Sequence, residues 1–297
     1  LRLAFVKGVD EYQELLRCSV AFAGNDHRLG AQEAPPAIIS VFLGEQLTDV
    51  IDSIIEGKTA RSRKKPVMEI GVSSLPPLPV DLSDRNRTSP FAFTGNKFEF
   101  RAVGSSQSIA PVNIALNAAV ACALDDIATQ LEAAVSAGTP LNQALQEFLP
   151  REFKEHSPVV FNGNGYSNTW PKEAERRGLP NLSNTVDALE HYSDPDVMNV
   201  FLRHGILSER EILSRQEILL DTYAKDIEIE GATLLDLVRG KVLPPCRAAQ
   251  AQACDLVLKT KKAGIEPDEE MKNLQTIRGH VTSMEKAVGQ LEEAIAK

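Results

Sequence analysis

Apolar residues recur at helical spacing in the first part of the chain. Residues 1–23 show a helix-like pattern, and residues 37–56 predict a second helix that stops at Gly57. Between them, residues 24–36 contain two glycines and a Pro-Pro pair on either side of charged residues, which predicts a loop and not the interior of a helix. The pattern therefore predicts two helices joined by a polar loop.

A strict alternation of apolar and polar residues predicts a β-strand over residues 96–103. The preceding residues 58–95 are rich in proline, serine and aspartate and predict extended segments and turns. A charged face would be out of place on an ordinary sheet, so we expect it to line a cleft. The two faces of the strand would carry Phe98, Phe100 and Ala102 on one side, and Lys97, Glu99 and Arg101 on the other.

A long helix is predicted over residues 111–137. Proline is favoured in the first turn of a helix and glycine just after its end, which is where Pro111 and Gly138 lie. Residues 139–206 predict several short helices and a glycine-rich turn at residues 162–166, for which a structural role is favoured over ligand contact by its backbone amides.

The chain becomes strongly helical from Leu207 onwards. Ser208 and Glu211 have the spacing of a capping box. Prolines 244 and 245 are expected to break the helical run, and Gly264 with Pro267 to break it again. The last segment predicts an antiparallel helical hairpin or a helix that packs on a partner, because for about three heptads its apolar residues recur in steps of three and four: Leu274, Ile277, Val281, Met284, Val288, Leu291 and Ile295. We expect two domains, residues 1–206 and residues 207–297.

The composition narrows the class of protein. The 297 residues are 43% apolar and 25% charged, as in ordinary globular proteins. A net charge of −9 argues against a general surface for nucleic acid or anionic membrane. The basic stretch at residues 58–65 is better explained as a solvated loop than as a phosphate site, and the apolar runs fall short of the ~20 residues that cross a bilayer. We expect neither a nucleic-acid partner nor a membrane partner.

The four cysteines predict free thiols and not a metal site. Cys18, Cys122, Cys246 and Cys254 form no CxxC pair, so we expect them to be buried in a reducing compartment. The five histidines share no spacing that suggests a metal, and His27 is better explained as a positioning or surface residue than as a ligand. The first residue is Leu, from which we expect the chain to begin inside a longer polypeptide.

Three polar motifs carry the candidate chemistry. Residues 25–35, 84–90 and 96–101 place several arginines and two glutamates on loops or on the charged strand face. Guanidinium forks bind carboxylates and phosphates bidentately, and a carboxylate among arginines is useful beside a metal and phosphates. From these residues alone, a phosphate-plus-carboxylate site and a set of solvated loops remain equally open.

The motifs resemble those of the glutamine synthetases. The segment N-D-H-R-L-G-A-Q-E-A-P-P at residues 25–36 resembles the family's K-R-L-x-x-G-x-E-A-P loop. D-R-N-R-T-S-P at residues 84–90 resembles its R-N-R-S segment, and N-K-F-E-F-R at residues 96–101 its R-x-E-x-R strand. P-V-N-I-A-L at residues 111–116 resembles the opening of the next helix, and the spellings, with F-N-G-N-G-Y-S at residues 161–167, point to the type III subgroup.

The resemblance implies a fold and an assembly. The fold class would be α+β: the C-terminal part of the catalytic domain over residues 1–206, with antiparallel strands lining a cleft and packed helices, followed by a helical extension over residues 207–297. The extension would help to form a homo-oligomer, a dodecamer of stacked rings. The location would be cytoplasmic, or organellar in a eukaryote.

The resemblance also implies the reaction and the role of each site residue. ATP, with Mg²⁺ or Mn²⁺, would drive the joining of ammonia to glutamate through a γ-glutamyl phosphate, giving glutamine, ADP and phosphate. The implied roles are substrate carboxylate binding for Arg28 and Arg101, a closing flap and proton acceptance for Glu33, neutralisation of the γ-phosphate for Arg87, nucleotide contact for Lys97 and metal ligation for Glu99. The family's other metal ligands lie upstream of the flap, so the isolated chain would be inactive.

Two departures and two alternatives accompany this interpretation. Glu33 follows Arg28 by five residues, one fewer than in the common form, and Ala92 stands where the family's R-N-R-S segment has a later arginine. The alternatives are a non-catalytic relative with a binding or assembly role and a related ligase that joins another amine or acid.

Overall fold

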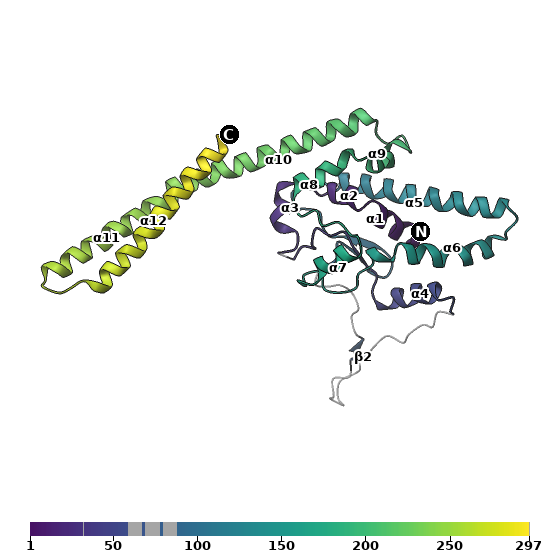
Figure 1. Cartoon of the computed structure of the whole chain (residues 1–297), viewed down its shortest axis with the longest axis horizontal. Helices are drawn as coiled ribbons and strands as arrows, with labels where there is room; N and C mark the ends of the chain where they lie inside the picture. The colour runs from purple at the N-terminus through teal and green to yellow at the C-terminus, as the bar shows by residue number, and fades with distance from the viewer. Residues whose placement is uncertain (32, 59–66, 69–77, 80–87, 297) are drawn as a thin grey trace. The chain divides into compact units, whose positions relative to one another are not determined.

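The computed structural model describes residues 1–31, 33–58, 67–68, 78–79 and 88–296. The candidate residue Arg87 and most of the basic stretch at 58–65 lie outside these ranges. The chain divides into two compact units, Leu1–Leu220 and Asp221–Lys297 (Figure 1). This division falls inside one long helix, and the division at residues 206 and 207 stays a prediction.

The first unit is mainly helical and contains a small sheet. The expected α+β class therefore holds in this coarse form. Its elements are α1 (Arg2–Glu11), α2 (Gln13–Cys18), α3 (Ala23–Arg28), β1 (Val41–Phe42), α4 (Glu45–Ile55), β4 (Phe91–Phe93), β5 (Phe98–Phe100), α5 (Ala110–Ser136), α6 (Leu141–Glu155), η1 (Ser157–Val159), α7 (Trp170–Arg176), α8 (Thr185–Glu190), η2 (His191–Ser193) and α9 (Pro195–Leu202). A separate antiparallel pair is formed by β2 (Val67–Met68) and β3 (Leu78–Pro79).

The sheet has the strand order β1-β4-β5 and mixes both directions. β1 runs parallel to β4, whereas β4 and β5 are antiparallel, with Ala92 opposite Glu99. The expectation of antiparallel strands is thus right for β4 and β5 and wrong for β1. The strand predicted over residues 96–103 is confirmed in its centre, Phe98–Phe100.

The helix predicted over residues 37–56 is wrong in its first part. Only Glu45–Ile55 is helical, and Val41–Phe42 forms β1. Ile38, Ile39 and Val41 are buried, and a short apolar run of β-branched residues that is buried in this way suits a strand. Gly44, with a φ of 76°, separates the strand from the helix.

The loop predicted over residues 24–36 begins later than expected. Residues 24–28 belong to the short helix α3, and the helix-like pattern of residues 1–23 is divided into α1 and α2. Six residues make a marginal helix on their own, so contacts with the rest of the unit must hold α3. These contacts are described with the candidate site below.

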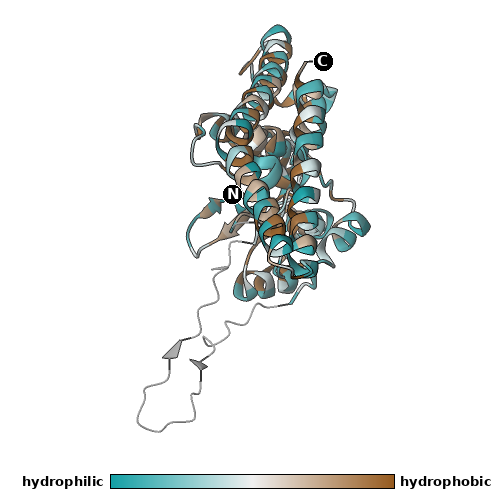
Figure 2. Cartoon of the chain, turned by 90° about the vertical axis from the view of Figure 1, so that its left-hand side faces the viewer, coloured by the Kyte–Doolittle hydropathy of each residue, from teal (hydrophilic) through white to brown (hydrophobic). Residues whose placement is uncertain are grey.

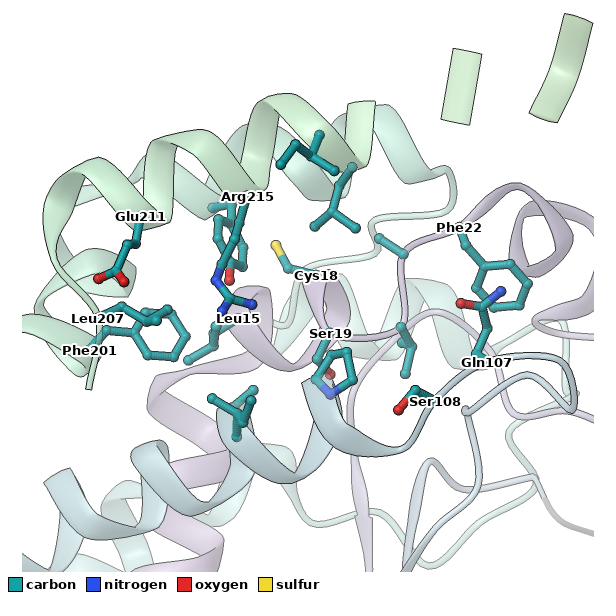
Figure 3. A pocket seen from close by; sticks show the side chains of 18 of the residues that line it. Leu15, Cys18, Ser19, Phe22, Gln107, Ser108, Phe201, Leu207, Glu211 and Arg215 are labelled. Carbon is teal, nitrogen blue, oxygen red and sulfur yellow. The ribbon is translucent and has the colours of Figure 1, made fainter. Parts of the chain in front are cut away.

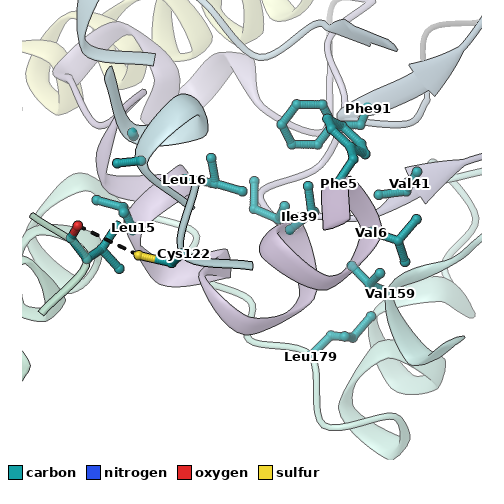
Figure 4. Packing of buried hydrophobic residues seen from close by; sticks show 14 of the residues in the cluster. Phe5, Val6, Leu15, Leu16, Ile39, Val41, Phe91, Cys122, Val159 and Leu179 are labelled. Atoms are coloured by element: carbon teal, nitrogen blue, oxygen red, sulfur yellow. Dashed lines mark hydrogen bonds between the residues drawn. The ribbon is translucent and has the colours of Figure 1, made fainter. Parts of the chain in front are cut away.

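The core of the first unit forms around α1. Figure 4 shows Phe5 and Val6 of α1 among residues from β1, β4 and the segment around Leu179. Phe5 stacks on Phe98 with ring centroids 3.7 Å apart, and Phe91 stacks on Phe100 at 4.3 Å. The apolar face predicted for β5 is therefore packed into the core, and Phe98 and Phe100 anchor the strand that carries Glu99.

Helix α5 packs closely on α1. A Cβ atom added to Gly8 would lie 3.0 Å from the backbone oxygen of Ala119, so the two helix backbones nearly touch. α5 is also, by length and composition alone, the one helix of the described residues that could cross a membrane, although its continuous apolar runs are short. Its buried residues, mostly alanines, lie in the half that packs on α1.

The second unit consists of helices. α10 (Glu209–Leu237) enters it and continues through a π-helical segment (Val238–Val242) into α11 (Leu243–Lys262) and α12 (Asp268–Ile295). The break expected at Pro244 and Pro245 is therefore wrong, because both prolines fit the first turn of α11, where their missing N–H groups cost little. The break at Gly264 is confirmed.

The predicted helical hairpin is formed by α11 and α12. Arg247 bonds Glu285 across it at 2.7 Å, and Val281 is buried between the two helices. α12 also packs on the end of α10, where the side chain of Ile295 approaches Gly231. Figure 2 shows apolar and polar residues mixed along these helices, several of whose apolar side chains are exposed.

Two smaller predictions can be checked directly. The capping box at the start of α10 is confirmed: Glu211 accepts from the Ser208 backbone N–H at 2.8 Å, and the Glu211 N–H donates to the Ser208 hydroxyl at 3.4 Å. All four cysteines are free thiols, as predicted, but only Cys18 and Cys122 are buried; Cys246 is half-buried and Cys254 is exposed.

Candidate functional site

A buried asparagine joins the first polar motif to the strand β5. Asn25 of α3 is fully buried, and its Nδ2 donates to the backbone oxygens of Val20 at 2.7 Å and Ala102 at 3.1 Å. Its Oδ1 accepts from Nη1 of Arg28 at 2.9 Å, and the same Nη1 lies 3.2 Å from the Ala102 oxygen. Arg28 is therefore held beside the residue that follows Arg101.

The charged face of β5 is a connected set of ions. The carboxylate of Glu99 lies 3.3 Å from Nζ of Lys97 and 3.3 Å from Nη2 of Arg101. The hydrogen bond from Arg101, and then that from Lys97, lowers the pKa of Glu99, so this side chain is ionised at neutral pH. The side chain of Arg101 is only 14% exposed, which favours strong binding of an anion by its guanidinium.

The described residues of the segment 30–35 form a tight turn that includes Glu33. The Gly30 N–H donates to the Pro35 oxygen at 2.9 Å, and the Ala34 N–H donates to the Ala31 oxygen at 2.9 Å. Glu33 is exposed and has a φ of 60°, in the left-handed region that costs a non-glycine residue energy. The turn therefore presents the carboxylate of Glu33 at the surface.

The end of the second motif, residues 88–90, contacts the strand of the third motif and the glycine-rich turn. The N–H of Arg101 donates to the Pro90 oxygen at 2.9 Å. A Cβ atom added to Gly165 would lie 2.2 Å from the Thr88 oxygen and 3.3 Å from Cδ of Pro36. The base of the turn at residues 30–35, the residue after Arg87 and the glycine-rich turn are thus in direct contact.

The glycine-rich turn at residues 162–166 serves the structure, as the sequence favoured. Oδ1 of Asn162 accepts from the backbone N–H groups of Leu43 and Gly44, each at 3.0 Å, and its Nδ2 donates to Thr48 Oγ1 at 2.8 Å. The spelling N-G-N-G signalled a turn, but not that Gly165 would lie against Thr88. Sequence reasoning likewise missed Asn25 as the residue that fastens Arg28.

We expect Gly165→Ala to destabilise the first unit by about 1–3 kcal/mol, because its methyl group would overlap a backbone oxygen that cannot move alone. Denaturant unfolding followed by fluorescence of Trp170, the one tryptophan of the chain, measures the effect. Gly279→Ala is the control, since nothing lies within 4 Å of its Cβ position on α12. An unchanged Trp170 transition for Gly165→Ala would show that the turn can move away.

The charged residues fit a metal only in part. Among the residues that the structure describes, no group of three or more His, Cys, Asp or Glu side chains is placed to hold a metal ion. Mg²⁺ bound with phosphates often uses only one or two protein carboxylates and keeps several waters. The ionised carboxylate of Glu99 suits that single role.

Part of the chain matches a known protein family. Residues 144–261 match the glutamine synthetase C-terminal domain, and the matched segment extends into both units. The match supports the resemblance to the glutamine synthetases, from a segment that lies C-terminal to the motifs of residues 25–116.

Curated glutamine synthetases match most of the chain, which confirms the resemblance seen in its motifs. The chain is 44% identical over 283 residues to the type-3 glutamine synthetase of Dictyostelium discoideum, covering 92% of this chain and 38% of that protein. It is 38% identical over 266 residues to a glutamine synthetase of Bacteroides fragilis, covering 89% of this chain and 36% of that protein. The chain thus spans little more than a third of the length of these curated relatives.

Proposed function

We propose that this chain supplies part of the active site of an ATP-dependent ligase that joins ammonia to the γ-carboxylate of glutamate. One observation carries the proposal: Asn25 and Arg28 are bonded to the backbone oxygen of Ala102, and the residue before it, Arg101, pairs with the ionised carboxylate of Glu99. The first and third motifs thus meet at Ala102, and their arginines and carboxylate suit an anionic substrate and a metal-bound phosphate.

The proposed roles are those that the resemblance implies, and the position and chemistry of the described side chains are compatible with them. Arg28 and Arg101 bind the substrate carboxylates. Lys97, whose side chain is 66% exposed, contacts the nucleotide. Glu99 holds Mg²⁺ or Mn²⁺, which when bound neutralises phosphate charge in the transfer of the γ-phosphoryl group. Arg87, which lies outside the described residues, is proposed to share that neutralisation.

Glu33 is proposed to act from the turn at residues 30–35. A carboxylate on an exposed turn can close over the site and accept a proton from ammonium. Closure would also keep water from the γ-glutamyl phosphate, which hydrolyses readily. We further propose a homo-oligomer, a dodecamer of stacked rings to which the second unit contributes contacts, and a cytoplasmic or organellar location.

The test is a turnover assay on a polypeptide that contains this chain and is as long as the curated relatives. We expect ADP release in the presence of Mg²⁺ that requires both glutamate and ammonia and that falls to background when aspartate replaces glutamate. A folded protein with no ammonia-stimulated turnover would instead support a non-catalytic binding or assembly role. Turnover with another acid or amine would support a related ligase.

A further inference from the structure

A cavity of 580 Å³ lies in the first unit, apart from the charged face of β5 (Figure 3). Its volume is within the range of roughly 300–1,000 Å³ that is usual for small-molecule sites. Most of its lining residues are apolar and come from four places in the sequence: the end of α2 and the segment after it, the loop after β5 with the start of α5, the region of α9, and the first turns of α10.

The walls of this cavity are fixed by packing and hydrogen bonds. On α10, Ile212 is fully buried, and Nε2 of Gln216 donates to the Leu189 oxygen at 2.7 Å. At the opposite end, the ring of Phe22 lies over Gly104 so closely that a Cβ atom there would be 2.3 Å from Cζ. A site with walls held in this way is largely formed before a ligand arrives.

One of the lining residues is an arginine, Arg215, which is exposed on α10. Figure 3 shows the side chain of Arg215 reaching from α10 toward Leu15 and Ser19. Within the described residues, Arg215 makes no hydrogen bond and no ion pair, although the chain contains many carboxylates. An arginine placed against an apolar wall without a carboxylate partner suits an anionic ligand group.

The other charges in the cavity compensate the positive charge only in part, since the charge of Arg215 contributes to the lowered pKa of one nearby carboxylate, after the hydrogen bonds of Ser208. Arg210 adds a second guanidinium, and Glu211 is the one carboxylate among the lining residues. Glu211 is already engaged by Ser208, whose hydroxyl and backbone N–H donate to it at 2.7 and 2.8 Å. The lining residues therefore carry a net charge of +1, next to an apolar wall that would accept a hydrocarbon body.

We propose that this cavity binds a small amphipathic monocarboxylic acid. Its carboxylate would pair with Arg215, and its apolar tail would extend along Pro111 and Ile114 toward Phe22. The loop that forms one wall directly follows Glu99 and Arg101, and Val20 in another wall accepts the hydrogen bond of Asn25. The acid would therefore lie behind the segments that hold the candidate site. The inference does not depend on the proposed ligase activity.

Calorimetric titration of the full chain with decanoate, below its micellar concentration, tests the proposal. We expect saturable binding of one decanoate per chain, much weaker binding of decan-1-ol and none of acetate. Arg215→Met should weaken decanoate binding roughly tenfold or more through loss of a charged hydrogen-bond donor, and leave decan-1-ol binding unchanged. Ile114→Trp should abolish decanoate binding by filling the apolar end.

The matched control is Arg176→Met, which removes an exposed arginine on α7 outside the cavity and should leave decanoate binding unchanged. Circular dichroism establishes that each variant is folded. Hydrogen exchange of the unmodified chain gives a second measure, because decanoate should protect amides of residues 103–108 and of the first turns of α10.

Several results would overturn the proposal. One is the absence of saturable decanoate binding below about 1 mM, an affinity near 4 kcal/mol. Another is binding that neither Arg215→Met nor Ile114→Trp weakens. If light scattering instead shows that Ile114→Trp changes the oligomeric mass while decanoate does not bind, this wall is a contact between copies of the chain.

Discussion

Replacing Lys7 with methionine is expected to lower the free energy of unfolding of the first unit by about 3–5 kcal/mol, the usual cost of removing one partner from a buried ionic cluster. Lys7 of α1 is 6% exposed. Its Nζ lies 2.5 Å from the carboxylate of Glu11, 3.7 Å from that of Glu152 and 3.2 Å from Nε2 of His156. Without Lys7, Glu11 and His156 would lose this partner, and Glu152 would keep only Arg151 among the described cations, whose Nη2 lies 2.9 Å from its carboxylate.

The chemistry of lysine also fixes the proton on His156. An ammonium group can only donate hydrogen bonds, so Nε2 of His156 must accept, and the ring proton lies on Nδ1. Nδ1 then donates to Asp10 at 2.8 Å. Burial alone would lower the pKa of Lys7, but the hydrogen bond and charge of Glu11, with the charge of Glu152, outweigh it and the pKa is raised. Lys7 is therefore charged at neutral pH.

A matched control exists on the surface. Lys225 pairs with Asp221 at the same helical spacing, but both side chains are more than half exposed. Lys225→Met should change the stability far less than Lys7→Met, since exposed pairs contribute little. Unfolding of the first unit is followed by Trp170 fluorescence, because this residue is 1% exposed and stacks on Phe161.

The effect should depend on the buried carboxylate. In the double variant Lys7→Met, Glu152→Gln, the loss should be smaller than the sum of the two single losses, because the second change removes a buried carboxylate that the first leaves with Arg151 as its one described cation. If Lys7→Met costs no more than Lys225→Met, the cluster contributes nothing beyond a surface pair, and its burial is not what stabilises α1 against α6.

Several elements could be predicted from the sequence because the interactions that define them are local. Pro111 and Gly138 bound α5 almost to the residue, and Ser208 with Glu211 marked the start of α10. The alternation around Glu99 found β5 because one of its faces packs in the core and the other does not. In each case the deciding interaction lies within a few residues of the signal.

Predictions failed where contacts distant in sequence decide the structure. α3 depends on Asn25, whose partner Ala102 is 77 residues away, so no local pattern could show it. The apolar run around Ile38 is equally compatible with a buried helix and a buried strand, and its pairing with β4 decided the outcome. The prolines at 244 and 245 are a local exception. They follow a π-helical segment and lie in the first turn of α11.

The candidate site, too, could be predicted only in part from the sequence. The motifs supplied the residue types, and the resemblance supplied their roles, but neither indicated which contacts bring the motifs together. Ala92 illustrates the difference: the structure places it directly opposite Glu99 and fully buried, so the arginine expected there from the family would have stood beside the proposed metal ligand. The cationic groups described next to Glu99 are Lys97 and Arg101.

Two matched substitutions, made in a polypeptide as long as the curated relatives, should separate the roles of Glu99 and Glu33. Glu99→Gln keeps the size of the side chain but removes the charge that would hold the metal, so the KM for Mg–ATP should rise. The rise should be at least the roughly 10- to 100-fold that loss of a supporting residue costs a metal site. Partial rescue by excess Mn²⁺ or Mg²⁺ would support this role.

Glu33→Gln should act on turnover instead. The amide preserves the shape of the turn at residues 30–35 and its strained backbone, but it cannot accept a proton, so kcat should fall roughly a hundredfold or more while the KM for Mg–ATP changes little. Glu175→Gln, at an exposed position on α7, is the control and should change neither constant. A metal ligand and a proton acceptor must affect different steps. If Glu99→Gln and Glu33→Gln lower only the thermal stability, or change kcat and the KM for Mg–ATP alike, the two carboxylates have no separate roles in metal binding and proton transfer.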